Sequence, residues 1–234
     1  MLDMGFIHDV KKVLAKLPAK KQSLLFSATM PRDVEALAQG LLHDPLRIAI
    51  TPPASTADRL DQRVYFVGKN DKPALLQHLL QNPAIARVLV FTRTKHGANK
   101  IARRLTADGT PCDAIHGNKS QNARENALAN FKSGRTRVLV ATDIAARGID
   151  VEGVTHVINL DLPNEPESYV HRIGRTARAG ASGVALSFCS PEENVFLRDI
   201  ERITRQRLTV VSHPFVSTAR DDAAAAPALP PRRE

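Results

Sequence analysis

The stretch VLVATDIAARGID, residues 138–150, predicts the fold of most of this chain. Its first four residues are apolar without interruption, which is typical of a strand covered by helices on both faces of a parallel sheet. Thr142 and Asp143 follow at the point where this strand ends. Because ligands of open α/β sheets bind beyond the carboxyl ends of the strands, these two polar residues mark a candidate binding edge.

From about Asp61 onward, apolar strand patterns alternate with helical patterns. Strands are expected at Arg63–Val67, Val88–Thr92, Cys112–His116, Val138–Thr142, His156–Leu160, Val184–Cys189 and Leu208–Val211. Helices are expected at Lys72–Gln81, Gly97–Ala107, Gln121–Ser133, a short turn near Ala145, Glu165–Ile173 and Glu192–Arg205. Strands and helices that alternate with short connections give a doubly wound parallel sheet, so the expected fold class is α/β, over residues 61–212.

The segments on either side of this alternation have a different character. Residues 1–50 hold two helical patterns and two short strand patterns, too few to close a core of their own. These elements are expected at Phe6–Leu17, Ser23–Phe26, Asp33–Leu42 and Leu46–Ile50. Proline and small polar residues predict a linker at 51–60, and the alanine- and proline-rich residues 213–234 predict a disordered tail.

Length and cysteine content limit the class of protein. The 234 residues suit one large α/β domain, or one domain with part of another. No apolar run approaches the ~20 residues of a membrane span, and the first residues lack the layout of a signal peptide. Cys112 and Cys189 stand far apart, which indicates neither a disulfide framework nor a zinc site and favours a cytoplasmic protein.

Charge and aromatic content indicate the kind of partner. The formal net charge of +9 favours a polyanion, most simply a nucleic acid. The chain has no tryptophan and only 4% aromatic residues, which leaves little capacity for base stacking. Contacts to a nucleic-acid backbone are therefore expected to dominate.

A second stretch, HRIGRTARAG at residues 171–180, holds Arg172, Arg175 and Arg178 at intervals of three. Such spacing fits a solvated basic helix face. Gly174 argues against that interpretation, because glycine weakens a helix by about 1 kcal/mol relative to alanine. The glycines also let the backbone bend, so that the guanidinium groups converge on a phosphate, which their planar donor forks suit.

Hydroxyl, glycine and basic residues also follow three of the expected strands. The residues at these strand ends are Thr92 to Lys95, His116 to Asn118 with Gln121 and Arg124 at the start of the next helix, and Thr142 with Asp143. Each one alone could serve only to cap a helix. Taken together, hydroxyls and the N–H groups of helix starts can hold successive phosphates of an extended nucleic-acid strand.

Asp150, with Gly148 beside it, is a candidate ribose contact. Acidic residues accept hydrogen bonds from ribose in nucleotide-binding folds, and glycine lets a ligand approach the backbone closely. The alternative is a turn carboxylate paired with Arg147. Further along, Asn164 to Glu167 has the spacing of a capping box and predicts a well-capped helix that carries the arginine run.

Five motifs, in this order and spacing, resemble those of DEAD-box RNA helicases of bacterial type. They are SAT at 27–29, VLVFT at 88–92, HG at 116–117 with Gln121 and Arg124, ATDIAARGID at 141–150 and HRIGRTAR at 171–178. The resemblance runs from Met1 to about residue 212. It implies a RecA-like helicase C-terminal domain, preceded at residues 1–50 by the end of a first RecA-like domain.

The resemblance also implies a role for each matching residue. Contacts to ATP would come from Gly148, Asp150, Arg175 and Arg178, the two arginines acting as fingers on the γ-phosphate. Contacts to the RNA backbone would come from Thr92, Arg93, Gly117, Arg124 and Thr142. Hydrolysis would be coupled to strand separation through Ser27, Thr29 and His171. The family uses ATP with Mg²⁺, and none of these residues is expected to bind the metal.

The sequence departs from the family pattern in one respect. It has no G-x-x-x-x-G-K-[ST] phosphate loop, no Asp-Glu-Ala-Asp motif and no adenine-reading glutamine segment. In the family, the sequence MLDMGF, here residues 1–6, follows shortly after Asp-Glu-Ala-Asp. The chain is therefore expected to be the C-terminal part of a helicase, to need the first RecA-like domain as a partner, and not to hydrolyse ATP alone.

Two other classes of protein are alternatives to the C-terminal part of a helicase. One is a stand-alone RNA-binding or regulatory module without ATPase activity, which the motifs alone leave open. The other is a dinucleotide-binding enzyme such as a dehydrogenase, which needs a G-x-G-x-x-G turn after its first strand, and the sequence has none. The RNA substrate and the oligomeric state are not indicated by any pattern.

Overall fold

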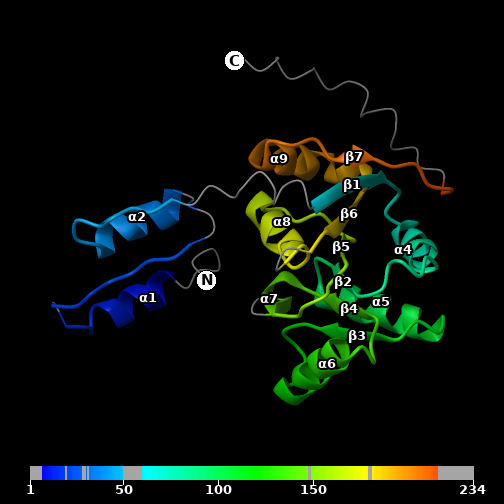
Figure 1. Cartoon of the computed structure of the whole chain (residues 1–234), viewed down its shortest axis with the longest axis horizontal. Helices are drawn as coiled ribbons and strands as arrows, with labels where there is room; N and C mark the ends of the chain where they lie inside the picture. Colours follow the sequence, from blue (N-terminus) through cyan, green and yellow to red (C-terminus); the bar gives the residue numbers. More distant parts are fainter. Residues whose placement is uncertain are drawn as a thin grey trace, which may run out of the picture. The chain divides into compact units, whose positions relative to one another are not determined.

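The computed structural model describes residues 7–18, 20–27, 30, 32–49, 60–146, 149–178 and 181–215. The chain divides into two compact units, Met1–Thr51 and Pro52–Glu234, which are described separately (Figure 1). The expected linker, apart from Leu60, and residues 216–234 of the expected tail lie outside the described residues.

The larger unit is built on a seven-stranded sheet in which every pair of neighbours is parallel. The strands are β1 Leu60–Phe66, β2 Val88–Phe91, β3 Cys112–Ile115, β4 Val138–Ala141, β5 His156–Asn159, β6 Gly183–Cys189 and β7 Thr209–Val210. Their order across the sheet is β3-β4-β2-β5-β6-β1-β7. The predicted parallel α/β fold is confirmed, and the carboxyl ends of β2, β4 and β5 lie side by side.

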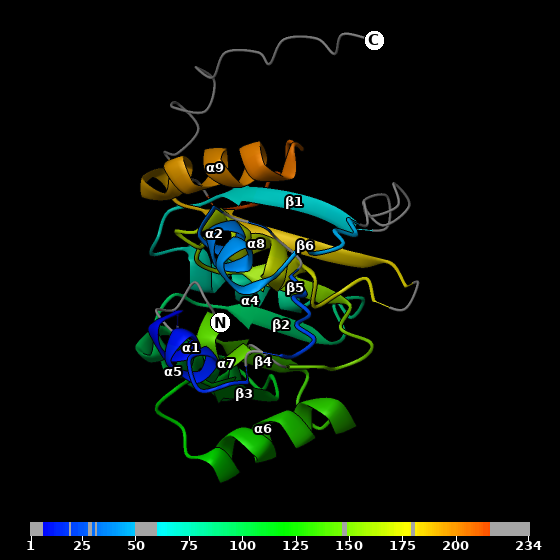
Figure 2. The same cartoon turned by 90° about the vertical axis from the view of Figure 1, so that its left-hand side faces the viewer.

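Helices cover both faces of this sheet (Figures 1 and 2). They are α4 Lys72–Leu80, α5 Lys95–Ala107, α6 Gln121–Ser133, α7 Asp143–Ala146, α8 Pro166–Ile173 and α9 Asn194–Thr204, with a 3₁₀ turn at Pro191–Glu193. In β2, Val88 and Val90 join the core cluster of α4 and α5, whereas Leu89 and Phe91 join that of α6 and α7. Because both faces are covered, the strand is apolar throughout.

The start of α8 differs from the prediction. Glu165 occupies the cap position and no side chain caps the helix, so the expected capping box from Asn164 is wrong. Pro166 is the first helical residue, and a proline there forces the preceding residue into an extended conformation, which moves the cap to Glu165. A capping box does form at Ser190 and Glu193.

The smaller unit contains α1 Ile7–Leu14 and α2 Arg32–Leu41. The strands expected at Ser23–Phe26 and Leu46–Ile50 are wrong, since residues 23–26 and 46–49 form no regular structure. A strand is stable only with partners that satisfy its N–H and C=O groups, and the described part of this unit offers none.

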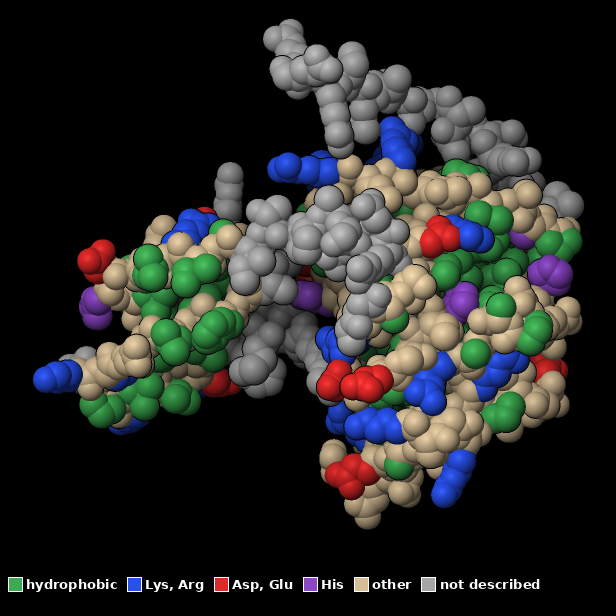
Figure 3. All heavy atoms as spheres, viewed as in Figure 1, with side chains coloured by type: hydrophobic (Ala, Val, Ile, Leu, Met, Phe, Trp, Pro, Cys, Tyr) green, Lys and Arg blue, Asp and Glu red, His purple; other side chains and the backbone are tan. Residues whose placement is uncertain are grey.

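Apolar side chains of the smaller unit face solvent (Figure 3). Phe26 is 89% exposed, Leu46 88% and Ile48 77%. That residues 1–50 close no core of their own stays a prediction, with which these exposed side chains are compatible. Exposure on this scale marks a surface that another part of a protein normally covers.

Candidate nucleotide-binding site

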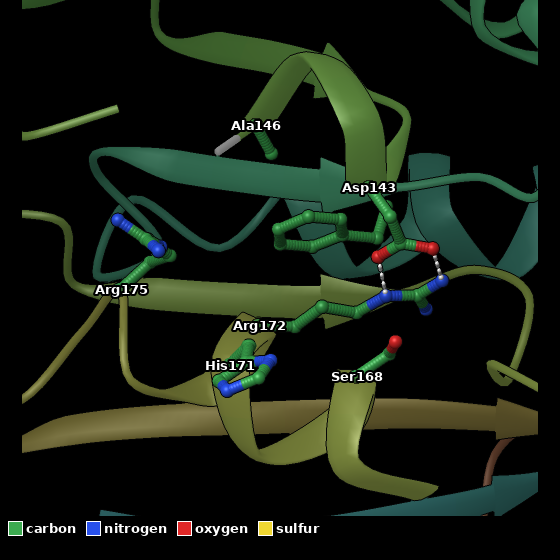
Figure 4. Close-up of a pocket in the computed structure, with 7 residues that line it drawn as sticks. Asp143, Ala146, Ser168, His171, Arg172 and Arg175 are labelled. Atoms are coloured by element: carbon green, nitrogen blue, oxygen red, sulfur yellow. Dashed lines mark hydrogen bonds and ion pairs between the residues drawn. The ribbon is translucent and has the colours of Figure 1, made fainter. Parts of the chain in front are cut away.

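The first arginine of the 171–180 run is buried. Arg172 is 2% exposed and pairs with Asp143 at the end of β4, with Nε–Oδ1 and Nη2–Oδ2 distances of 2.5 and 2.7 Å (Figure 4). Its Nη1 donates to Asn159 Oδ1 at 3.2 Å and to the Asp161 carbonyl at 2.7 Å. The guanidinium also lies 5.0 Å above the centre of the Phe91 ring. Arg172 therefore ties α8 to the ends of β2, β4 and β5, and is not free to contact a phosphate.

The other two arginines converge on one short segment. Arg175 Nη1 donates to the Ile149 carbonyl at 2.8 Å, and Arg178 Nη1 donates to Asp150 Oδ1 at 2.5 Å. Burial and the neighbouring Arg178 lower the pKa of Arg175, and the charge of Asp150 offsets them only in part. A half-buried cation that forms no ion pair with a described carboxylate favours an incoming anion. The predicted convergence therefore holds for two arginines out of three.

The bend that brings these two arginines together has a different origin from the one expected. Helix α8 ends at Gly174, whose φ of −65° is ordinary for any residue. The turn falls instead at Ala177, with φ +55°, a left-handed conformation that non-glycine residues rarely adopt. Gly180 lies outside the described residues. Arg175 and Arg178 thus share a direction because the chain turns between them.

A small pocket opens beside Arg172 and Arg175 (Figure 4). It is lined by Phe91, Asp143, Ala146, Ser168, His171, Arg172 and Arg175. The predicted coupling residue His171 is exposed here, and Ser27 lies in the smaller unit. Thr29 and Gly148 lie outside the described residues.

The expected alternative for Asp150 was a pair with Arg147, which is outside the described residues. Among the described residues Asp150 pairs with Arg178, so two residues assigned by resemblance to one nucleotide contact each other. The Asp150 side chain is 83% exposed and the Arg178 side chain 33% exposed. An ion pair this accessible contributes at most about 1 kcal/mol, so a bound nucleotide can replace it.

The predicted RNA contacts lie at the ends of the neighbouring strands β3, β4 and β2, but differ in accessibility. Gly117 has open space around it, and the half-buried side chain of Arg124 has no hydrogen bond or ion pair to a described residue. Thr92 and Thr142 are buried, and the Thr92 hydroxyl donates to the Thr94 carbonyl at 3.2 Å. Gly117 and Arg124 are therefore more open to a ligand than the two threonines.

Arg93 is held by an ion cluster that no local sequence pattern predicts. Glu193, 5% exposed, lies 2.9 Å from Arg93 Nη2 and 2.5 Å from Lys72 Nζ. Lys72 Nζ also donates to the Leu160 carbonyl at 2.7 Å. Arg93 lies 100 positions and Lys72 lies 121 positions from Glu193 along the chain, so only the fold brings these three residues together.

His116, 2% exposed, is held in its neutral form beside Gly117. Its Nδ1 accepts from the Asn118 N–H at 3.3 Å, which leaves Nε2–H to donate to Asn99 Oδ1 at 3.0 Å. Burial, followed by the positive charge of Lys119, lowers the pKa of His116.

The free energy of unfolding is therefore expected to fall as the pH is lowered from 7 to 5. Above about pH 6.5 the imidazole is neutral in both states; below it, the unfolded chain binds a proton that folded His116 resists. Urea unfolding at both pH values, compared with a His116→Gln variant, measures this. The variant should lose less stability on acidification, and His156, whose pKa is lowered by burial, accounts for the remaining slope. Equal losses in parent and variant would contradict the assignment to His116.

Metal-binding side chains and membrane-spanning helices are two further features by which a protein can be classified. Among the described residues, no group of three or more His, Cys, Asp or Glu side chains is arranged to hold a metal ion. Within the same part of the chain, no helix is long and apolar enough to cross a membrane.

Sequence comparison places the larger unit in a known class of domain. The family model for the helicase conserved C-terminal domain matches residues 71–180. ATP-dependent RNA helicase CshA of Listeria monocytogenes is 44% identical over 214 residues, which cover 92% of this chain and 41% of the relative. DEAD-box ATP-dependent RNA helicase CshA of Geobacillus kaustophilus is 42% identical over 219 residues, covering 94% and 47%. The chain thus spans less than half the length of these curated relatives.

Solved structures that resemble this chain also include DEAD-box proteins. E. coli DEAD-box protein SrmB, crystallised with regulator of ribonuclease activity A, is 37% identical with a TM-score of 0.63, covering 66% of this chain and 91% of that one. S. cerevisiae Dbp5 bound to RNA and ADP BeF3 is 30% identical with a TM-score of 0.80, covering 89% and 56%. The sheet and the matched model define a RecA-like helicase C-terminal domain. The chain belongs to the DEAD-box family of ATP-dependent RNA helicases.

Proposed function

We propose that this chain is the C-terminal part of an ATP-dependent DEAD-box RNA helicase of the cytoplasm, and that Arg175 and Arg178 are its arginine fingers. The observation that carries the proposal is their convergence on Ile149 and Asp150 at the binding edge of the sheet. Fingers of this kind stabilise charge that develops on a transferring phosphoryl group, and are worth about 10³–10⁵ in rate. Arg172 does not share the role, because Asp143 already neutralises it.

The arrangement at 149–178 fits a nucleotide. Asp150 would accept hydrogen bonds from the ribose hydroxyls, and Gly148 would let the nucleotide approach the backbone. Binding would replace the exposed Asp150–Arg178 pair, which frees both side chains at small cost. ATP with Mg²⁺ supplies the phosphoryl group and the charge that offsets its oxygens. The described residues hold no carboxylate cluster for the metal, so we assign Mg²⁺ binding to a first RecA-like domain.

Residues 1–50 would be the end of that first domain, and they would carry Ser27 and Thr29 of its coupling motif. Support comes from the matches to CshA proteins, which include most of this segment, and from the exposed apolar side chains that a larger domain would cover. His171 would transmit hydrolysis to this motif from the exposed side of the pocket.

The RNA backbone would lie along the ends of β3, β4 and β2. Gly117, Arg124 and the exposed Arg93 would contact phosphates directly, whereas the buried Thr92 and Thr142 would shape the surface beneath them. Lys95 lies on the same edge, where its Nζ bonds Asn118 Oδ1 at 3.2 Å and so links two of the loops. The net positive charge supports a polyanionic partner.

RNA binding by the 234-residue chain is expected to weaken about 50-fold between 50 and 200 mM salt, if about four phosphates are contacted. Fluorescence anisotropy with a labelled single-stranded RNA measures this dependence. Arg124→Ala should reduce the slope of log K against log salt by about 0.7. The control Arg135→Ala, an exposed arginine before β4 at the opposite edge of the sheet, should leave it unchanged. Binding that does not respond to salt would contradict the proposed interface.

ATP turnover separates a helicase part from a stand-alone RNA-binding module. The chain alone is expected to show no RNA-stimulated hydrolysis, because the sequence lacks a phosphate loop. A two-domain protein, made by placing the upstream part of Listeria CshA before this chain, should hydrolyse ATP when RNA is added. Turnover by the chain alone would contradict the assignment of the ATP site to two domains. An inactive two-domain protein with intact RNA binding would favour the module.

A further inference from the structure

A buried threonine lies between the two converging arginines in the sequence, and its side chain points into the domain. Thr176 lies between Arg175 and Arg178 and is only 3% exposed. Its hydroxyl donates to the Val154 carbonyl at 2.5 Å and lies 3.3 Å from the Thr155 carbonyl. The arginine loop, residues 174–178, is thus anchored to the chain just before β5.

The same segment that receives Thr176 also carries the contacts of the arginines. Arg175 bonds the Ile149 carbonyl, Arg178 bonds the Asp150 carboxylate, and Thr176 bonds Val154. These three attachments join the arginine loop to residues 149–155. Because Asp150 belongs to this segment, the buried Thr176 anchor fixes the backbone of the loop relative to the proposed ribose contact, while the exposed Arg178–Asp150 pair stays replaceable.

Gly183, the first residue of β6, provides the space for this anchor. A Cβ atom on Gly183 would lie 2.3 Å from Thr176 Oγ1, 2.7 Å from Thr176 Cγ2 and 2.7 Å from the Ala177 backbone nitrogen. All three distances are shorter than van der Waals contact, and the last involves backbone that a rotamer change cannot move. The glycine is therefore required for close approach, which is one of the two common reasons for glycine at a fixed position.

Ala177 shows that the loop is held against a local conformational cost. Its φ of +55° is unfavourable for a residue with a Cβ, by about 1–2 kcal/mol. Such a conformation persists when the surroundings determine it. The Thr176 hydrogen bonds on one side and the Gly183 contact on the other are the surroundings that do so.

We propose that Thr176 and Gly183 are positioning residues, which lock the arginine loop so that Arg175 and Arg178 both face the nucleotide phosphate. The inference rests on the proposed function of these arginines and adds the device that orients them. Displacements of about 1 Å at a reacting centre can lower a rate by about 100-fold, so a lock of this kind has a measurable effect without touching the substrate.

The lock itself is tested on the 234-residue chain, independently of ATP hydrolysis. The Nε–H signals of Arg175 and Arg178 in ¹⁵N NMR spectra are compared for the parent, Gly183→Ala, Thr176→Val and Thr176→Ser. Thr176→Val keeps the shape and removes the hydroxyl, whereas Thr176→Ser keeps the hydroxyl. Gly183→Ala and Thr176→Val should shift or broaden both arginine signals, and Thr176→Ser should retain the parent signals.

Gly68→Ala is the matched control, because its Cβ would meet only the flexible end of the Asp71 side chain, at 3.2 Å. It should leave the arginine signals unchanged. Parent-like signals in both Gly183→Ala and Thr176→Val, with the fold intact, would overturn the lock. If Gly183→Ala fails to fold, Thr176→Val is compared with Thr176→Ser. Equal arginine signals in these two variants would overturn the lock.

The link to catalysis is tested in the two-domain protein. Gly183→Ala and Thr176→Val should lower kcat for ATP hydrolysis by about 10- to 100-fold, while the KM for RNA and the kcat of Gly68→Ala stay within about twofold of the parent. Unchanged kcat in both variants would overturn the positioning role. Absence of turnover in the parent two-domain protein would instead refute the proposed function, and the NMR comparison would still decide whether the lock exists.

Discussion

Replacing Arg172 by leucine is expected to lower the free energy of unfolding by about 3 kcal/mol. The substitution leaves the Asp143 carboxylate, the Asn159 amide oxygen and the Asp161 carbonyl without their donor. Removing one partner of a buried pair costs about 3–5 kcal/mol, and the lower figure applies because the Asp143 side chain is 37% exposed and regains water.

Urea unfolding of the 234-residue chain, followed by far-ultraviolet circular dichroism, measures this loss. Arg178→Leu is the matched control, since it removes an arginine from the same run whose ion pair is largely exposed. The control should cost no more than about 1 kcal/mol. A loss for Arg172→Leu as small as that of the control would contradict the structural role of Arg172.

Replacing Arg175 by alanine in the two-domain protein should reduce ATP turnover by about 10³-fold or more. Among the described residues the half-buried guanidinium bonds a single backbone carbonyl, so its loss should not unfold the domain. Arg175→Lys should recover little of the rate, because an ammonium group cannot donate a planar pair of hydrogen bonds to phosphate oxygens. Steady-state hydrolysis with saturating RNA measures all three proteins.

RNA affinity provides the control for this prediction. Arg175 lies near residues 149–150, whereas the proposed RNA contacts Gly117 and Arg124 follow β3, so RNA binding by Arg175→Ala should match that of the parent. Turnover within about twofold of the parent would remove Arg175 from the role of a finger. A parallel loss of RNA affinity would indicate that the substitution disturbs the whole edge of the sheet.

The parallel sheet could be predicted because its strands are short, apolar runs separated by helical patterns. All residues of β2 and β4 are buried. A strand that is covered on both faces appears in the sequence as a continuous apolar run, which is the pattern of Val88–Phe91 and Val138–Ala141. The strands expected in residues 1–50 were wrong because their apolar runs have no partner strand among the described residues. An apolar run such as Ser23–Phe26 becomes a strand only when a neighbouring strand pairs with it, and the pattern of a single run does not reveal its partner.

The geometry of the candidate site could not be predicted from the sequence, and the roles assigned to its residues stay predictions. Arg172, Arg175 and Arg178 look alike in a sequence of repeating arginines. What separates them is the location of their partners: Asp143 lies 29 residues from Arg172, and Asp150 lies 28 residues from Arg178. The turn at Ala177 likewise depends on Gly183 and on the chain before β5, because alanine by itself does not favour a left-handed conformation.

Arg175 and Arg178, and not Arg172, are proposed to face the phosphate of bound ATP. A crystal structure of the two-domain protein with RNA, ADP and beryllium fluoride tests this arrangement. Guanidinium nitrogens of both residues are expected within about 3 Å of the phosphate mimic, with Arg178 released from Asp150 and Arg172 still bonded to Asp143. A bound nucleotide with Arg175 still on the Ile149 carbonyl and Arg178 still on Asp150 would contradict it.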